Sequence, residues 1–198
     1  MLGEKVAIVG QGLIGVLTAA TLRAMDFDVT VIDVNAGRLN VSKLFCPPGI
    51  KIWNPRIAAL LEKFDVCIEV TGTMTGLQTA VDSTAAGGRV IIGSWFGGSN
   101  HTLYLGTSFH RSHITLKASQ VSTVPAHLSM RWSKSRRFAL SWNVLRQLRP
   151  SRLLELAGRR MSLTNVDSAN LDSLSADILE CYSRLDRGLD LTTLISYK

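Results

Sequence analysis

Cysteine is scarce in this sequence: among 198 residues there are three, Cys46, Cys67 and Cys181. No two of them form a C-x-x-C pair, which argues against both a disulfide framework and a structural zinc site. We therefore expect free thiols in a reducing compartment.

Long hydrophobic runs are also missing. Every strand-like apolar segment is interrupted by Gly, Asp or Arg before it reaches the length of a transmembrane helix. Residues 1–5 lead directly into the first such segment, without the apolar region and cleavage site of a signal peptide. The sequence therefore predicts a cytoplasmic protein with no membrane partner.

The whole chain has a net charge of +7, and acidic residues are few in its middle part. From 109 to 160 there are nine Arg and two Lys but a single acidic residue, Glu155. The basic residues of 131–160 are interleaved with an apolar helical pattern, as on a solvated helix face. We expect no nucleic-acid partner, and a role near cofactor phosphates or at a subunit contact stays open.

The sequence contains one strong motif, which lies near the start of the chain. An apolar strand-like run, Val6–Val9, leads into a G-x-G-x-x-G turn formed by Gly10, Gly12 and Gly15. The first glycine permits the tight turn, the second lets the backbone approach a pyrophosphate, and the third lets the next helix pack closely. Leu13 and Ile14 begin that helix, whose first N–H groups face the phosphates. The motif predicts a dinucleotide site.

An acidic residue further along the chain is a candidate for binding the same dinucleotide. Asp33 ends the second strand-like segment, eighteen positions after Gly15. A carboxylate there accepts hydrogen bonds from both hydroxyls of the adenosine ribose and repels a 2′-phosphate, so the sequence favours NAD over NADP. Arg38 follows closely, and its guanidinium either stacks on adenine, faces solvent or serves a phosphate.

Strand-like and helix-like segments then alternate along the chain. Strands are expected over 29–32, 50–53, 64–72, 89–93 and 114–119, and either a short strand or an extended segment over 100–105. Helices are expected over 16–25, 39–44, 55–63 and 77–86. This order predicts an α/β fold with a doubly wound parallel Rossmann sheet. Gly72 and Gly93 follow strands, as Gly10 and Asp33 do, so we expect all four at the carboxyl edge, where ligands bind.

The C-terminal part has a different pattern. Helices are expected over 128–148 and 167–187, and a strand over 190–197. We divide the chain into an NAD-binding domain, 1–125, and an α/β tail, 126–198. Strand-like apolar ends around 153–156 and 191–195 would expose unpaired edges, which favours a homo-oligomer or a complementary catalytic chain as partner.

The sequence resembles the cofactor domain of the medium-chain dehydrogenases/reductases, the zinc-type alcohol dehydrogenase family. The resemblance rests on residues 6–33, 64–72 and 85–94; residues 105–112, 114–122, 131–132 and 136–137 resemble a subgroup related to threonine and polyol dehydrogenases. It implies that the turn glycines hold the pyrophosphate and Asp33 the ribose. It also implies that Gly93 and Ser94 lie along the nicotinamide, and that Ser119 approaches its carboxamide.

One large departure from the family concerns catalysis. The family begins with a catalytic domain that supplies the zinc ligands, whereas this chain starts where that domain should already have ended. The tail from Ser151 onward resembles the segment that completes the catalytic domain. Zinc is thus expected in the family, but no ligand transfers to Cys46, Cys67 or Cys181, and we expect the isolated chain to be inactive.

Two functions follow from these patterns. The first is the cofactor half of an NAD-dependent alcohol or polyol oxidoreductase, and the second is a non-catalytic Rossmann module that binds a dinucleotide or a partner. His110 is the most suggestive acid–base candidate, but packing in a loop is the commoner role of such a histidine. Glu69, unusual inside a strand, is interpreted as locally hydrogen-bonded at a strand edge rather than as a site residue.

Overall fold

The computed structural model describes residues 3–59, 62–98, 102–149, 151–163, 179–180, 183–184 and 192–197. The chain forms two compact units, Met1–Leu148 and Arg149–Lys198. None of the described helices is both long enough and apolar enough to cross a membrane.

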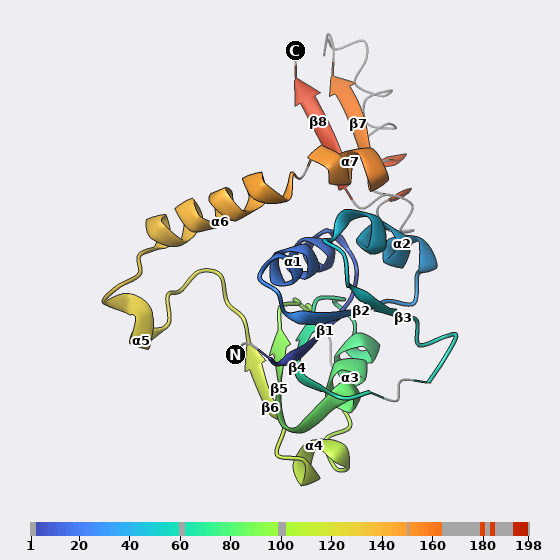
Figure 1. Ribbon diagram of the computed structural model, residues 1–198, viewed down its shortest axis with the longest axis vertical. Helices are drawn as coiled ribbons and strands as arrows, with labels where there is room; N and C mark the ends of the chain where they lie inside the picture. The colour runs from blue at the N-terminus through green and yellow to red at the C-terminus, as the bar shows by residue number, and fades with distance from the viewer. Residues whose placement is uncertain are drawn as a thin grey trace. The chain divides into compact units, whose positions relative to one another are not determined.

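The first unit is built on a six-stranded sheet in which every neighbouring pair of strands is parallel (Figure 1). The strand order is β3-β2-β1-β4-β5-β6, which is the order of a doubly wound Rossmann sheet. The predicted fold class is therefore confirmed. The strands are β1 (Lys5–Val9), β2 (Asp28–Ile32), β3 (Lys51–Trp53), β4 (Phe64–Glu69), β5 (Thr84–Ile92) and β6 (Thr115–Ala118).

Helices cover the two faces of this sheet. On one side lie α1 (Leu13–Ala24) and α2 (Ala36–Phe45), and on the other α3 (Met74–Ser83) and α4 (Ser108–Arg111) (Figure 1). Two further helices, α5 (Ala126–Ser129) and α6 (Lys134–Leu148), complete the first unit. Both helices lie within the predicted tail, 126–198, whereas the compact units divide after Leu148.

The central strands are apolar because both of their faces are covered. Val6–Val9 of β1 and Val29–Ile32 of β2 are buried without interruption, as in parallel sheets generally. The core against α3 is formed by Ala7, Val9, Ile32, Phe64, Cys67, Leu77, Ala80, Val81, Val90 and Ile114. This burial fixes the strands whose carboxyl ends carry the candidate site.

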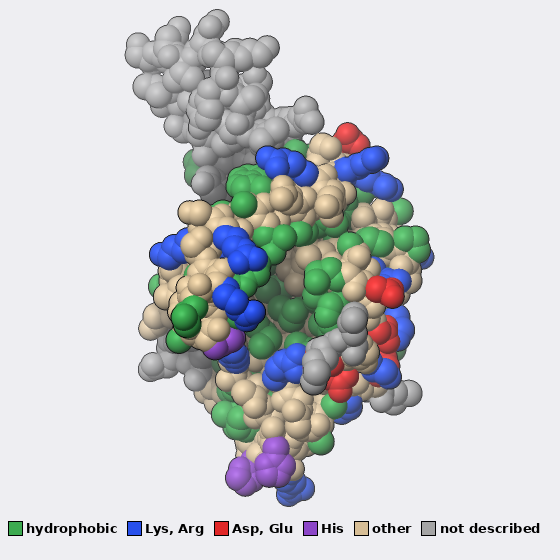
Figure 2. Space-filling model, turned by 60° about the vertical axis from the view of Figure 1, so that its left-hand side comes forward, with side chains coloured by type: hydrophobic (Ala, Val, Ile, Leu, Met, Phe, Trp, Pro, Cys, Tyr) green, Lys and Arg blue, Asp and Glu red, His purple; other side chains and the backbone are tan. Residues whose placement is uncertain are grey.

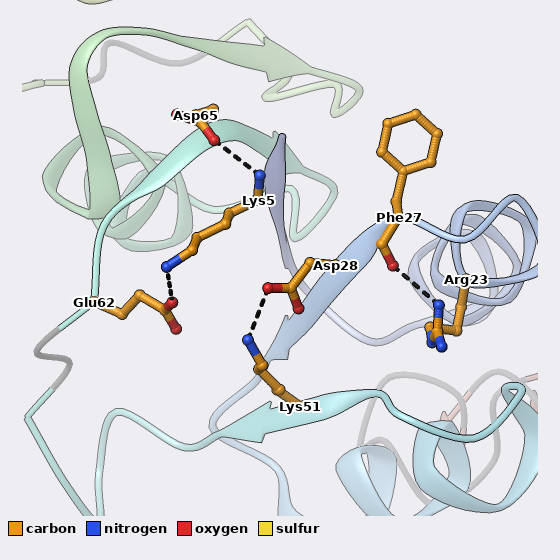
Figure 3. Close-up of polar contacts among 7 residues, drawn as sticks. All are labelled: Lys5, Arg23, Phe27, Asp28, Lys51, Glu62 and Asp65. Carbon is orange, nitrogen blue, oxygen red and sulfur yellow. Dashed lines mark hydrogen bonds and ion pairs between the residues drawn. The ribbon is translucent and has the colours of Figure 1, made fainter. Parts of the chain in front are cut away.

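The amino ends of the strands are held by charged contacts (Figure 3). The Lys5 ammonium lies 2.6 Å from the Glu62 carboxylate, which raises the pKa of Lys5, and the Lys5 N–H donates to Asp65 at 2.8 Å. Lys51 lies 2.8 Å from Asp28 in the same region. The two edges of the sheet therefore differ in chemistry: charged pairs at the amino edge, glycines and threonines at the carboxyl edge.

Local capping explains where several elements begin. The Thr73 side chain accepts a hydrogen bond from the Gly76 N–H, so α3 begins at Met74, three residues earlier than predicted. The Ser133 hydroxyl accepts from the Arg136 N–H at 3.1 Å, which starts α6 after a break. The single helix predicted over 128–148 is therefore two helices.

One predicted element of the first unit is wrong. The helix predicted over 55–63 is a turn at 55–57, and the described residues of that segment contain no helix. The Asn54 side chain explains the turn, because its Oδ1 accepts from the Arg56 N–H at 2.9 Å and its Nδ2 donates to the Val34 carbonyl at 3.3 Å. Of the two alternatives expected over 100–105, the short strand is absent from the described residues 102–105.

The second unit contains α7 (Ser151–Ala157) and a parallel pair of strands, β7 (Gly158–Leu163) and β8 (Thr192–Tyr197). The strand predicted at the C-terminus is confirmed as β8. The strand-like end predicted at 153–156 is wrong: this segment belongs to α7, because Leu, Glu and Ala all favour helix. The helix predicted over 167–187 lies almost entirely outside the described residues.

Candidate functional site

A cavity of about 470 Å³ opens at the carboxyl ends of β1, β2 and β4. Four of the residues predicted as site residues line it: Gly10, Gly12, Asp33 and Arg38. Strand β1 pairs with β2 on one side and β4 on the other, so the order of strands reverses there. A crevice at such a switch point is where ligands bind in open α/β sheets.

The three glycines of the turn have three different reasons to lack a side chain. Gly10 has a φ of +101°, and a Cβ there would lie 2.9 Å from the Val70 carbonyl carbon. A Cβ on Gly15 would lie 1.9 Å from the Gly10 carbonyl oxygen, which shows how closely α1 packs on the turn. A Cβ on Gly12 would meet no atom within 4 Å. Gly12 therefore borders open space at the cavity.

The N-cap of α1 lines this cavity. Gly12 is its N-cap and provides no side-chain hydrogen bond, and no acidic residue lies in the first turn. Leu13 and Ile14 are 36% and 64% exposed, so the start of the helix is accessible. Free N–H groups and the positive end of the helix dipole favour an anion at this position.

Asp33 is fixed at the end of β2 by backbone donors. Its Oδ2 accepts from the Gln11 N–H at 2.7 Å and its Oδ1 from the Asn35 N–H at 2.8 Å. The residue is 7% exposed. Each oxygen retains a second lone pair, so the carboxylate can still accept from two ligand hydroxyls.

A buried side-chain link, which the sequence analysis missed, joins the glycine turn to α2. Gln11 is fully buried; its Nε2 donates to the carbonyls of Ile8 and Gly10, and its Oε1 accepts from the Ser42 hydroxyl at 2.8 Å. The sequence offered one sign of this link, the polar residue Gln11 at the first variable position of the G-x-G-x-x-G motif. Its partner, 31 residues away, gave no signal.

Arg38 lies in the first turn of α2 and lines the cavity. The Asn35 side chain caps this helix by accepting from the Arg38 N–H at 3.2 Å. Within the described part of the chain, the buried Nε of Arg38 has no hydrogen-bond partner. A buried donor without a partner at a cavity wall fits a ligand acceptor that completes it.

Four other predicted site residues lie at the ends of β4, β5 and β6, outside the lining of this cavity: Gly72, Gly93, Ser94 and Ser119. Gly72 donates to the Ser94 hydroxyl at 2.8 Å, which joins the loops after β4 and β5. The Gly93 N–H donates to the Glu69 carbonyl at 2.9 Å, and the Ser119 N–H to the Ile92 carbonyl at 2.8 Å. The structure thus places them on the same sheet edge as the cavity.

Four threonines that follow β4 also line the cavity, and they were not predicted from the sequence: Thr71, Thr73, Thr75 and Thr79. The N–H and hydroxyl of Thr71 both donate to Glu69 Oε1 at 2.6 Å. The local hydrogen bonding expected of Glu69 is therefore present, but β4 is an interior strand rather than an edge. Glu69 is fully buried, and its Oε2 has no partner among the described residues.

The histidines and cysteines do not form a metal site in the described residues, where no three His, Cys, Asp or Glu side chains lie close enough to hold an ion. His110 is exposed on α4. Cys46 and Cys67 are free and buried, and burial raises their pKa values to about 12 and about 11. Cys181 lies outside the described residues. The described histidines and cysteines therefore do not fit the zinc that the resemblance implies.

The chain is similar in sequence to two dehydrogenases, although no family model matches it. It is 30% identical over 98 residues to L-threonine 3-dehydrogenase of Aeromonas salmonicida, covering 46% of this chain and 29% of that protein. It is 35% identical over 101 residues to sorbitol dehydrogenase of Rattus norvegicus, covering 46% and 28%. The match therefore spans less than a third of either relative.

Solved structures extend the likeness in fold to nearly the whole chain. An alcohol dehydrogenase of Thermotoga maritima superposes with a TM-score of 0.71 at 15% identity, covering 100% of this chain and 51% of that one. YhdH of Escherichia coli K-12, solved with bound NADPH, has a TM-score of 0.64 at 16% identity, covering 98% and 54%. The predicted resemblance to the medium-chain, zinc-type alcohol dehydrogenase family is thus confirmed: a threonine and a sorbitol dehydrogenase are among the sequence relatives, and an alcohol dehydrogenase is among the structural neighbours.

Proposed function

We propose that this chain is the cofactor-binding portion of an NAD-dependent oxidoreductase that acts on alcohols or polyols. The observation that carries the proposal is the cavity at the switch point, where Gly12 leaves open space beside Asp33 and Arg38. When bound, a nicotinamide dinucleotide supplies or accepts a hydride. The named relatives, a threonine and a sorbitol dehydrogenase, support this class of reaction.

Each part of the dinucleotide has residues to hold it. The turn from Gly10 to Gly15 and the start of α1 would bind the pyrophosphate. Asp33, with one free lone pair on each oxygen, would accept from the adenosine ribose, which favours NAD over NADP. Gly93, Ser94 and Ser119, with Gly72 beside them, would line the nicotinamide end.

The proton transfer that accompanies hydride transfer needs a group outside the described site. Hydride transfer from an alcohol requires a base that accepts the hydroxyl proton, and hydride transfer to the corresponding carbonyl requires an acid that returns it. The described histidines, His110, His113 and His127, are all exposed, and none of the described residues that line the cavity is a histidine or cysteine. We propose that another segment or polypeptide supplies this chemistry, and that the isolated chain binds the dinucleotide without oxidising alcohols.

A second candidate function is a non-catalytic module that binds a dinucleotide and a protein partner. It is favoured by the exposure of apolar side chains on α6, where Phe138 is 55% and Trp142 59% exposed. Figure 2 shows Lys and Arg side chains around a hollow lined by hydrophobic ones. Such a mixed surface suits a second copy of the chain or a complementary chain better than nucleic acid.

The proposed location is the cytoplasm. It is supported by the two buried cysteines of the first unit, Cys46 and Cys67, which are both free thiols. A reducing compartment keeps such thiols unpaired.

Calorimetric titration of the chain with NADH and NADPH tests the proposal. We expect NADH to bind in the micromolar range or weaker, NADPH to bind more weakly still, and no turnover of alcohols. A Gly12→Val variant should lose NADH binding, because its side chain would fill the space that Gly12 leaves open.

Three outcomes would contradict this proposal. Unchanged binding by the valine variant would remove the glycine turn from the site. Binding of NADPH equal to that of NADH would overturn the role of Asp33. Turnover by the purified chain would show that the chemistry lies within it.

A further inference from the structure

One threonine, Thr71, fills the space beside two glycines that belong to different elements. A Cβ on Gly10, the first glycine of the turn, would lie 2.9 Å from Thr71 Cγ2. A Cβ on Gly76, in the first turn of α3, would lie 2.1 Å from Thr71 Oγ1. Thr71 therefore lies between the glycine turn and the start of α3, with its methyl group against the turn and its hydroxyl against the helix.

The bonding capacity of the Thr71 hydroxyl is used entirely within the chain. It donates to Glu69 Oε1 at 2.6 Å, accepts from the Thr73 N–H at 3.0 Å and lies 3.0 Å from the Thr73 hydroxyl. A hydroxyl has one hydrogen and two lone pairs, so three such contacts saturate it. Although Thr71 lines the cavity, its hydroxyl therefore acts through neighbouring residues rather than on a bound molecule.

These contacts form a chain of hydrogen bonds with one direction. Because the single hydroxyl hydrogen of Thr71 goes to Glu69, the Thr73 hydroxyl is the donor of the pair that it forms with Thr71. The Thr73 oxygen in turn accepts from the Gly76 N–H at 3.1 Å and so caps α3. The chain runs from the first turn of α3 to the Glu69 carboxylate, and hydrogen bonds linked in this way strengthen one another.

Glu69 anchors the other end of this chain. Its side chain is fully buried, and its Oε1 also accepts from the Thr71 N–H at 2.6 Å. Its carbonyl accepts from the Gly93 N–H at 2.9 Å, and the Gly72 N–H donates to the Ser94 hydroxyl at 2.8 Å. One buried carboxylate thus fixes the loop after β4, which contacts the glycine turn, α3 and the end of β5.

We propose that Thr71 is a positioning residue for dinucleotide binding, and that Glu69 acts by holding the Thr71 hydroxyl in place. A loop that is fixed before the ligand arrives lowers the entropic cost of binding, because less of the cavity wall has to be ordered. The inference rests on the dinucleotide site proposed above. It adds two residues at the end of β4 that act through the backbone around them.

The test compares wild type, Thr71→Val and Thr71→Ser by calorimetric titration of the full chain with NADH. Valine keeps the shape of threonine but removes the hydroxyl that joins Thr73 to Glu69. We expect the NADH affinity of Thr71→Val to fall about fivefold, which corresponds to the net contribution of about one hydrogen bond. Serine keeps the hydroxyl, so the affinity of Thr71→Ser should stay within about twofold of wild type.

A double-mutant cycle tests the role of Glu69. Glu69→Leu removes the acceptor of the Thr71 hydroxyl and should also lower the NADH affinity about fivefold. Because the two residues act as one unit, the double variant Glu69→Leu/Thr71→Val should lose well short of the roughly 25-fold expected of independent sites. If Glu69→Leu does not fold, the comparison of valine with serine at Thr71 decides alone.

Thr84→Val is the matched control, because it makes the same chemical change at another buried threonine. The Thr84 hydroxyl donates to the Ala80 carbonyl at 2.8 Å at the start of β5, outside the cavity lining. This variant should lower the urea midpoint and leave the NADH affinity unchanged. A loss of stability is thereby separated from a loss of positioning.

The outcomes distinguish this inference from the proposed function. If wild type does not bind NADH, the proposed function fails and the inference fails with it. If wild type binds NADH but Thr71→Val binds it equally well, or Thr71→Ser loses as much affinity as Thr71→Val, only the role of Thr71 is refuted. A loss multiplied in the double variant would refute the role of Glu69, and an equal loss in Thr84→Val would assign the effect to stability and overturn the inference.

Discussion

Alanine substitutions at two glycines of the same turn should separate folding from binding. At Gly15 the new Cβ would lie 1.9 Å from the Gly10 carbonyl oxygen and 2.9 Å from its carbon, both backbone atoms that cannot rotate away. At Gly12 it would meet nothing within 4 Å. The two changes are chemically identical and three residues apart, so their difference reports on the surroundings alone.

The expected magnitudes follow from these distances. Overpacking against backbone costs about 3 kcal/mol, and replacing a helical glycine by alanine returns about 1 kcal/mol, so Gly15→Ala should lower the free energy of unfolding by about 2 kcal/mol. Gly12→Ala loses only the preference for glycine at an N-cap, about 0.5 kcal/mol. Its NADH affinity should nevertheless fall about tenfold, because the methyl group occupies space left for the ligand.

Urea unfolding followed by far-ultraviolet circular dichroism measures the first effect, and calorimetric titration with NADH the second. Equal stability of Gly15→Ala and wild type would refute the close approach of α1 to the turn. A destabilisation of Gly12→Ala as large as that of Gly15→Ala would refute the open space at Gly12.

Three further predictions concern the same unit. Ser42→Ala should lower the free energy of unfolding by about 1 to 2 kcal/mol, since it leaves a buried amide oxygen unpaired; an unchanged urea midpoint would contradict this. The hydrogen bond from Arg89 lowers the pKa of Glu4 from 4.5 to about 2, so the stabilisation by this pair is full above about pH 4.5 and is lost as the pH falls toward 2. Arg89→Gln should therefore be less stable than wild type at pH 6, with a difference that shrinks below pH 4.5, and a constant difference would count against the pair. In a Cys181→Ser variant, the remaining thiols of Cys46 and Cys67 should react slowly with a thiol reagent at pH 8, because burial raises their pKa values to about 12 and about 11. Rapid labelling of the folded chain would contradict their burial.

The sequence predicted the sheet well, because its signals are local. Val6–Val9, the glycine turn and Asp33 together indicate a strand, a crossover helix and a second strand, and the parallel order follows from the handedness of such connections. Segments with weaker patterns were less informative. The helix predicted over 55–63 is a turn, because the Asn54 side chain bonds the local backbone, and 153–156 joins α7 rather than a strand.

The candidate site also contains residues that the sequence predicted and residues that it did not. Gly10, Gly12, Asp33 and Arg38 were identified from the motif and its spacing, and all four line one cavity. The link between Gln11 and Ser42 could not be predicted, because it depends on how α2 packs against the turn. Arg56 likewise reaches the cavity only through the fold of the segment after β3.

The central claim is that a nicotinamide dinucleotide binds at the carboxyl edge of the sheet around the glycine turn. Amide proton and nitrogen chemical shifts of the labelled chain, recorded during a titration with NADH, test this claim most directly. The account predicts that the largest changes occur at Gly10–Gly15, at Asp33 and in the loop from Thr71 to Thr73. No change at saturating NADH, or changes centred on Lys5 and the other charged residues at the amino edge, would contradict it.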